Sequence, residues 1–144
     1  LYFTGFSRIA SVIVSEQLQR IKESAAQLKR MREMVDEGLG ILTGPGDLAE
    51  FGGLLDESWR LKRTLSSKVS SAFIDELYER ARSAGALGGK LLGAGGGGFL
   101  LLFAKPERHA AVAAKFKDLL RVPFRFETEG SRIILYQPDD DGRR

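Results

Sequence analysis

Six consecutive small residues separate two apolar runs: Gly93, Ala94, Gly95, Gly96, Gly97 and Gly98. Ordering four adjacent glycines costs much backbone entropy, and no side chain offsets that cost. We therefore interpret this segment as backbone that must come very close to a ligand. A run of N–H groups without Cβ atoms can form a nest around an anion, so the pattern favours a phosphate.

A flexible hairpin loop is the alternative interpretation of these glycines. An ordinary hairpin, however, needs glycine only at one or two defined positions. The segment is also not a Walker loop, because Lys90 precedes the glycines instead of following them. The pattern alone indicates an anion close to the backbone and names no particular ligand.

Composition excludes several other kinds of site. The chain has no cysteine and a single histidine, His109, so thiolate and histidine-cluster metal sites are excluded, and we expect a cytoplasmic protein. The net charge of +3 is spread along predicted helical faces, whereas nucleic-acid binders concentrate it in one stripe. The longest apolar run is too short to cross a bilayer. We therefore expect neither nucleic acid nor membrane as a partner.

The elements that must position the glycines follow from hydrophobic periodicity. Apolar residues at helical spacing predict helices over residues 8–36, from Asp47 to about Leu61, and over the segment that Gly85 ends. Pro106 begins a fourth helix that reaches Leu120. The predicted strands cover residues 1–5, 90–92, 99–104, 124–127 and 132–136.

This order predicts an α+β fold, an antiparallel sheet with helices packed on one face, close to a ferredoxin-like sandwich with an added helical lobe. The strands at 90–92 and 99–104 should pair as a hairpin across the glycines. Residues 1–138 would form one domain, and 139–144 a polar tail. Because the chain opens inside an apolar, strand-prone run without Met, we expect it to be part of a larger protein.

Residues 85–98, which read GALGGKLLGAGGGG, closely resemble the third signature motif of the GHMP kinases. The segments FTGFSR (3–8), LDESWRLKR (55–63), IDELY (74–78) and GSRII (130–134) extend the resemblance over nearly the whole chain. Together they look most like the D-glycero-D-manno-heptose 7-phosphate kinases, which use ATP to phosphorylate the anomeric oxygen of a bacterial sugar phosphate. Related fucose and uronic-acid kinases share parts of this pattern.

The resemblance implies a C-terminal kinase domain and not a whole kinase. The family's second motif, a Gly-Leu-Ser-Ser loop around the ATP phosphates, is missing, as is the N-terminal lobe that supplies Mg²⁺ ligands and the proposed catalytic Asp. ATP and Mg²⁺ would be bound mainly by that lobe, which becomes an expected partner beside the sugar phosphate. This chain alone would be inactive, and a second copy of it, in a homo-oligomer, is a further candidate partner. Leu92 departs from the Thr of many members, so a hydroxyl contact there is not carried over.

The resemblance also suggests site residues. Residues 93–98 would form one wall of the phosphate cradle, and Arg8, Lys62 and Lys90 are candidates for the substrate's phosphate. Solvated surface charge is the alternative for each, and it is the preferred interpretation of Arg63. Asp56 and Glu57 would orient the acceptor only in a cleft, so we expect a solvated helix face for them; Trp59 is expected in the core. No catalytic residue and no metal ligand is assigned within this chain.

Two other classes of function remain open at this point. A ferredoxin-like sandwich with a glycine loop also suits a stand-alone sensor of a phosphate-bearing small molecule. A helical interaction protein would use residues 8–36 as its binding surface.

Overall fold

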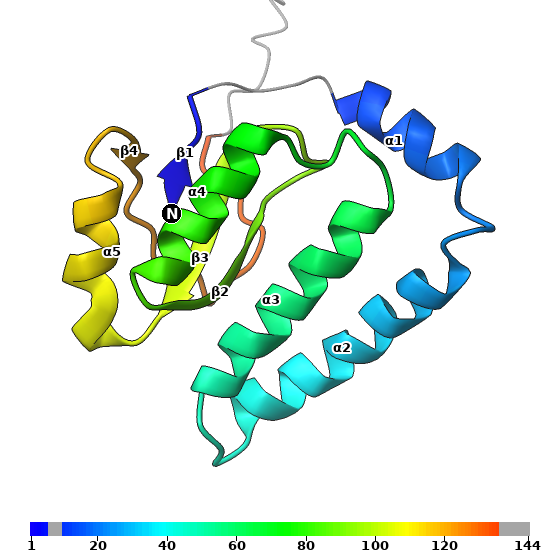
Figure 1. Ribbon diagram of the computed structural model, residues 1–144. Helices are drawn as coiled ribbons and strands as arrows, with labels where there is room; N and C mark the ends of the chain where they lie inside the picture. The colour runs from blue at the N-terminus through cyan, green and yellow to red at the C-terminus, as the bar shows by residue number, and fades with distance from the viewer. Residues whose placement is uncertain (6–9, 136–144) are drawn as a thin grey trace, which may run out of the picture.

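A four-stranded antiparallel sheet forms the centre of the protein, in the order β2 (Ala86–Leu91), β3 (Phe99–Ala104), β1 (Tyr2–Phe3) and β4 (Leu120–Arg121) (Figure 1). The computed structural model describes residues 1–5 and 10–135. Within them the α+β prediction is confirmed. The elements are β1 (Tyr2–Phe3), α1 (Ala10–Gln19), α2 (Ala25–Thr43), α3 (Ala49–Thr64), α4 (Ala72–Ser83), β2 (Ala86–Leu91), β3 (Phe99–Ala104), the 3₁₀ turn η1 (Pro106–Arg108), α5 (His109–Lys115) and β4 (Leu120–Arg121).

The predicted hairpin across the glycines is confirmed. Leu91 pairs with Leu100 in antiparallel register, and the Leu92 N–H donates to the Phe99 carbonyl at 2.8 Å. Strand β2 begins at Ala86, however, four residues before the predicted start. Its glycines hid it, because glycine is depleted in strands.

Gly88 has a packing reason to be glycine. Helix α3 runs along β2 so closely that a Cβ at Gly88 would overlap the Gly52 carbonyl oxygen. In turn, a Cβ at Gly52 would lie 2.5 Å from the Leu87 Cβ. The backbones of α3 and β2 are therefore in direct contact here, whereas a helix and a sheet usually contact each other through side chains.

The core lies between the sheet, α3 and the pair α4–α5, which covers one face of the sheet (Figure 1). Ser71 caps α4, its hydroxyl accepting from the Ile74 N–H. The largest fully buried side chains are Trp59, Phe116, Ile13, Ile74, Leu77, Leu91 and Leu100.

The single helix predicted over residues 8–36 is wrong. The chain turns between Gln19 and Ala25, and α1 and α2 run in different directions (Figure 1). Ile13 of α1 is buried in the main core, whereas Met34 of α2 is buried where that helix pairs with α3. The apolar residues of α1 thus pack on the main core and those of α2 pack on α3. A single straight helix could not reach both surfaces.

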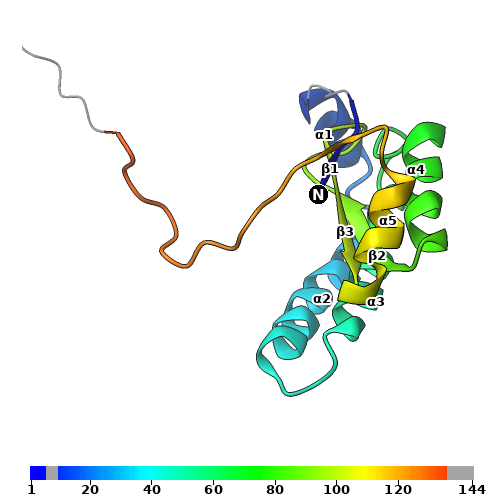
Figure 2. The same ribbon diagram turned by 90° about the vertical axis from the view of Figure 1, so that its left-hand side faces the viewer.

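The C-terminal part also departs from the prediction. Helix α5 ends at Lys115, and the next strand is β4, which pairs with β1. Residues 122–135 contain no strand and leave the sheet as an extended segment (Figure 2). Alternating apolar residues make a strand only beside a neighbour, and after Val122, whose N–H donates to the Leu1 carbonyl at 2.9 Å, no described strand lies beside this segment. Residue 136 and the tail at 139–144 lie outside the described residues.

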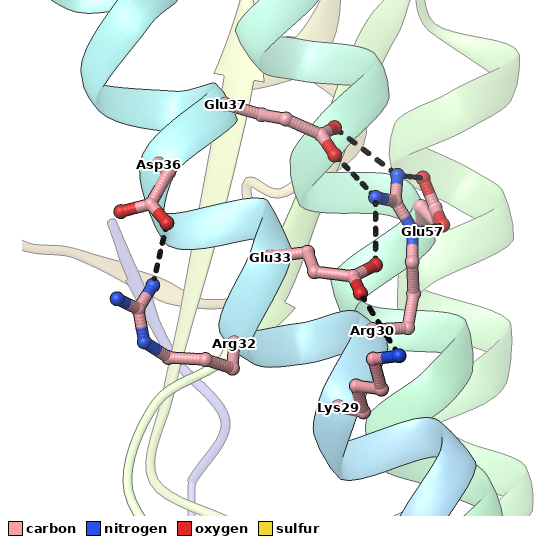
Figure 3. A network of polar contacts seen from close by, with 7 residues as sticks. All are labelled: Lys29, Arg30, Arg32, Glu33, Asp36, Glu37 and Glu57. Atoms are coloured by element: carbon pink, nitrogen blue, oxygen red, sulfur yellow. Dashed lines mark hydrogen bonds and ion pairs between the residues drawn. The ribbon is translucent and has the colours of Figure 1, made fainter.

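Arg30 joins α2 to α3 through carboxylates on both helices (Figure 3). Its guanidinium donates to Glu57 of α3 at 2.7 and 2.9 Å, and to Glu37 of its own helix at 3.1 Å. This arginine lowers the pKa of the Glu57 carboxyl. Glu57 is therefore a partner in helix pairing.

Candidate phosphate-binding loop

The loop between β2 and β3, residues 93–98, needs glycine for its backbone conformation. Its φ angles are +76° at Gly93, +120° at Gly95, +73° at Gly96 and +104° at Gly98. Side-chain-bearing residues rarely adopt these values. Residues 95–97 are buried, so the centre of the loop packs against the protein.

Two buried residues hold the loop from outside the hairpin. The Gly96 N–H donates to the Val69 carbonyl at 2.8 Å, and a Cβ at Gly95 would lie 2.7 Å from the same oxygen. At the other end, the Gly98 N–H donates to the Thr4 hydroxyl at 3.0 Å, and that hydroxyl donates to the Gly98 carbonyl at 2.9 Å. The loop is therefore fixed at its centre and its exit.

Sequence reasoning missed both of these anchors. Val69 acts through its carbonyl oxygen, which every residue has, so no side-chain pattern could have singled it out. Thr4 lies within the segment FTGFSR that resembled the kinases, and its hydroxyl was the available signal.

Positive charge lies at the entry to the loop. Lys62, at the end of α3, directs its ammonium to the carbonyl of Leu91, at 3.4 Å, and to that of Gly93. Burial, and then the charge of Lys90 on β2, lower the pKa of Lys62 to about 8. Two of the three predicted lysine and arginine candidates therefore lie beside the glycines. The third, Arg8, lies outside the described residues.

The remaining polar candidates lie in structural contacts. Asp56 is only 9% exposed and accepts a hydrogen bond from the Tyr78 hydroxyl at 2.6 Å, so the expected solvated face is wrong for this residue. Its other oxygen pairs with Arg60 at 2.8 Å. Arg63 pairs with Asp75 of α4 at 3.1 Å, so it is engaged in an ion pair between two helices instead of being a free surface charge.

Trp59 and His109 lie in contrasting places. Trp59 is fully buried, as predicted. His109 is exposed, and its Nε2 lies 3.0 Å from the Ala104 carbonyl oxygen.

The backbone amides of the loop differ in engagement and in accessibility, because Gly93 is exposed and Ala94 half-buried whereas residues 95–97 are buried. The Gly96 and Gly98 amides are engaged within the protein, whereas those of Gly95 and Gly97 donate to no carbonyl of residues 1–5 and 10–135. Unengaged amides beside two lysines are suited to an anion. In the same described ranges, no group of three or more His, Asp or Glu side chains gathers as metal ligands would. None of the described helices has the length and apolarity that crossing a bilayer requires.

Comparison with known proteins identifies the family. The model of the family described as GHMP kinases C terminal matches residues 25–121, which include α2 to β4 and the whole glycine loop. The chain belongs to this family. The resemblance found in the sequence is thereby confirmed.

Curated relatives of this GHMP kinase domain act on different substrates by name. A bifunctional fucokinase/GDP-fucose pyrophosphorylase of Arabidopsis thaliana is 36% identical over 75% of this chain and 10% of its own length. A D-glycero-alpha-D-manno-heptose 7-phosphate kinase of Campylobacter jejuni is 29% identical over 75% of this chain and 32% of its own. A mevalonate kinase of Pyrococcus horikoshii is 33% identical over 90% of this chain and 40% of its own.

A solved structure agrees with this assignment. Mevalonate kinase of L. major, in complex with R-mevalonate, superposes with a TM-score of 0.67 at 26% identity, covering 81% of this chain and 36% of that one. The chain thus spans well under half the length of each of these relatives.

Proposed function

We propose that this chain is the C-terminal domain of an ATP-dependent sugar-phosphate kinase, and that residues 93–98 form one wall of its phosphate cradle. The conformation of the loop is the main support for this proposal. The loop combines four glycines with positive φ, anchors at Val69 and Thr4, and unengaged amides. Phosphoryl transfer depends mainly on positioning and on stabilising charge. A fixed backbone nest is suited to both tasks.

Lys90 and Lys62 support the same proposal through their charge. Both lie at the loop entry, and among the described residues neither forms an ion pair with a carboxylate. A phosphate dianion would supply the missing counter-charge. Arg8 remains a candidate for the same role.

As acceptor we propose D-glycero-D-manno-heptose 7-phosphate, phosphorylated at the anomeric oxygen. The residue motifs that resembled this branch and the relative from Campylobacter jejuni support it. The fucokinase and mevalonate kinase relatives make fucose and mevalonate the competing acceptors. The relatives reported above are all named for kinase activity, which favours a kinase domain over a stand-alone sensor or a helical interaction protein.

We propose that residues 1–138 work with an N-terminal lobe that holds most of the ATP and Mg²⁺. Residues of this chain would contribute backbone donors and cations from the opposite wall. Mg²⁺, when bound, neutralises charge on the phosphates during transfer.

The test replaces Gly96 by valine in the kinase chain that carries this domain. A branched side chain at φ +73° strains the loop and obstructs the approach of an anion. We expect kcat/KM for ATP to fall about a hundredfold, the size of loss that a misplacement of about 1 Å causes. Heptose 7-phosphate should be the preferred acceptor in a panel with fucose and mevalonate.

Gly130→Val is the matched control, because Gly130 has φ +70° but lies in the extended segment outside the loop. It should keep the kinetics of the wild type. Unchanged kinetics in a folded Gly96→Val protein would contradict the phosphate cradle and return the loop to an ordinary hairpin.

A further inference from the structure

Lys62 differs from three of the other lysines in what its ammonium contacts. Lys29, Lys68 and Lys105 each lie within 4.0 Å of a carboxylate. Lys62 instead contacts two main-chain carbonyls, those of Leu91 and Gly93. These two residues are the last of β2 and the first of the glycine loop, so the ammonium bridges the point where strand becomes loop.

Those carbonyls need a donor from outside the hairpin. Pairing between β2 and β3 ends with the Leu92 N–H on the Phe99 carbonyl, and the φ of +76° at Gly93 turns the chain away from β3. An ammonium carries three donors and no acceptor, so one lysine serves both oxygens. Lys62 thus links both oxygens to α3.

Lys62 thus completes a set of three anchors. Val69 holds the centre of the loop and Thr4 holds its exit. The entry, where the exposed Gly93 has open space around its Cα, is held by Lys62. A glycine segment has many accessible conformations, so each anchor reduces the entropy that ligand binding must otherwise remove.

We propose that Lys62 is a positioning residue, whose ammonium fastens the entry of the glycine loop to α3 and so sets where the loop amides meet a phosphate. The part of this inference that concerns phosphate rests on the proposed function; the part that concerns the loop does not. Lys62 acts here through the backbone of the loop entry, whereas Lys90 lines the groove between α2 and α3.

The surroundings of Lys62 make its proton a usable reporter. Lys90 on β2 is the charged group that acts on it, and together with burial it lowers the pKa to about 8. Other charged side chains nearby are engaged elsewhere: Arg63 of α3 with Asp75, and Lys68, next to the Val69 anchor, with Glu16. The loop itself carries no titratable side chain.

The first experiment follows the carbonyl ¹³C resonances of Leu91 and Gly93 in the 144-residue chain, from about pH 6.5 to 9.5. Both should move together with a midpoint near 8, because the neutral amine is a weaker donor. Lys62→Gln should abolish the transition. Lys90→Gln should move the midpoint upward, and Lys105→Gln, whose lysine pairs with Asp47, should not change it.

Lys62→Arg keeps the charge at all these pH values and should hold both resonances at their low-pH positions. It also covers the case in which Lys62→Gln fails to fold. Carbonyl resonances that stay still in the wild type, or that titrate equally in Lys62→Gln, would overturn the inference.

The second experiment measures kinetics in the kinase chain that carries this domain. Lys62→Gln should lower kcat/KM for ATP about tenfold, and Lys62→Arg should restore most of it and remove the decline above pH 8. If Lys62→Gln keeps wild-type kinetics while Gly96→Val is impaired, the proposed role of Lys62 is refuted and the phosphate cradle is not. Carbonyl titration as expected, with neither variant impaired, would instead refute the phosphate cradle while the loop anchor stands.

Discussion

At the scale of single residues, Asp56 and Tyr78 form the most deeply buried polar contact of the helical layer. The Tyr78 hydroxyl donates to Asp56 at 2.6 Å from a ring that is 3% exposed. Burial, and then the hydrogen bond to Asp56, raise the pKa of Tyr78 above its ordinary value of 10.0. The pair therefore contributes to stability while the phenol is protonated.

Tyr78→Phe should lower the free energy of unfolding by about 1–3 kcal/mol near neutral pH, because it removes a donor from a buried carboxylate. Above pH 10 the unfolded chain releases the phenol proton and the folded chain keeps it, so the wild type loses this contribution as pH rises. The difference between the two proteins should shrink there. Denaturant unfolding, followed by the fluorescence of the single tryptophan, Trp59, measures both effects.

Tyr2→Phe is the control for this prediction. Tyr2 is also buried, at 6% exposure, and stacks on Phe116, but its hydroxyl has no hydrogen bond among the described residues. Its removal should change stability little. Equal losses in the two variants would show that the Asp56 contact contributes nothing.

A single residue could be predicted from the sequence only where its side chain, or the lack of one, is itself a signal. Trp59 was predicted in the core because large rings are usually buried, and the glycine loop was found because its composition is unusual. Asp56 was misplaced, because nothing in its neighbours along the chain shows that Tyr78 lies opposite. Val69 could not be found at all, since its contribution is a carbonyl oxygen.

At the scale of elements, the close contact between the backbones of α3 and β2 fixes the position of α3 and of its side chains on the sheet. Gly52→Ala would place a Cβ 2.5 Å from the Leu87 Cβ and 3.0 Å from the Phe103 ring. We expect it to lower the free energy of unfolding by about 1–3 kcal/mol, the usual cost of overpacking. Thermal and chemical denaturation would measure the loss.

Gly53 provides a matched control on the same helix. A Cβ there meets nothing within 4 Å, so Gly53→Ala should stabilise the protein by about 0.5–1 kcal/mol through helix propensity. If both substitutions stabilise, helix and strand are not in the close contact described here.

Element boundaries were predictable only where a local signal marks them. The hairpin and the helices α3 and α4 follow from apolar runs and glycines in the sequence. The break between α1 and α2 did not, because the apolar stripe continues through it and the two packing surfaces are set by tertiary structure. The expected strands after β4 failed for a related reason: alternation predicts a face but cannot supply a neighbouring strand.

At the scale of the whole molecule, several apolar surfaces are exposed among residues 1–5 and 10–135. A groove of about 510 Å³ between α2 and α3 is lined by side chains such as Met31 and Phe51, and Val35 and Leu39 beside it are more than half exposed. In the extended segment, Phe126 is 93% exposed. Exposed apolar area of this kind is typical of interaction surfaces.

We therefore expect the 144-residue chain alone to show no ATP-dependent phosphorylation of heptose 7-phosphate, at most feeble ATP binding, and a tendency to self-associate. The groups that hold Mg²⁺ and orient the acceptor typically account for orders of magnitude in rate. Turnover assays of the short chain and of the proposed two-lobe kinase, with light scattering on both, provide the measurement. Comparable turnover by the short chain would place the catalytic groups within it.

The backbone contact between Gly52 and Gly88 has a consequence for how this domain can be recombined. Gly52 of α3 and Gly88 of β2 each leave room for the backbone of the other segment, so neither segment can be replaced without the other. A chimera that takes α3 from one relative and β2 from another inherits two halves of a fitted contact, and should express poorly. A chimera that exchanges both segments together should tolerate distant parents. We therefore expect α3 and β2 to be exchangeable between relatives only as a pair. Lys62 at the end of α3 and the glycine loop after β2 would be exchanged with them.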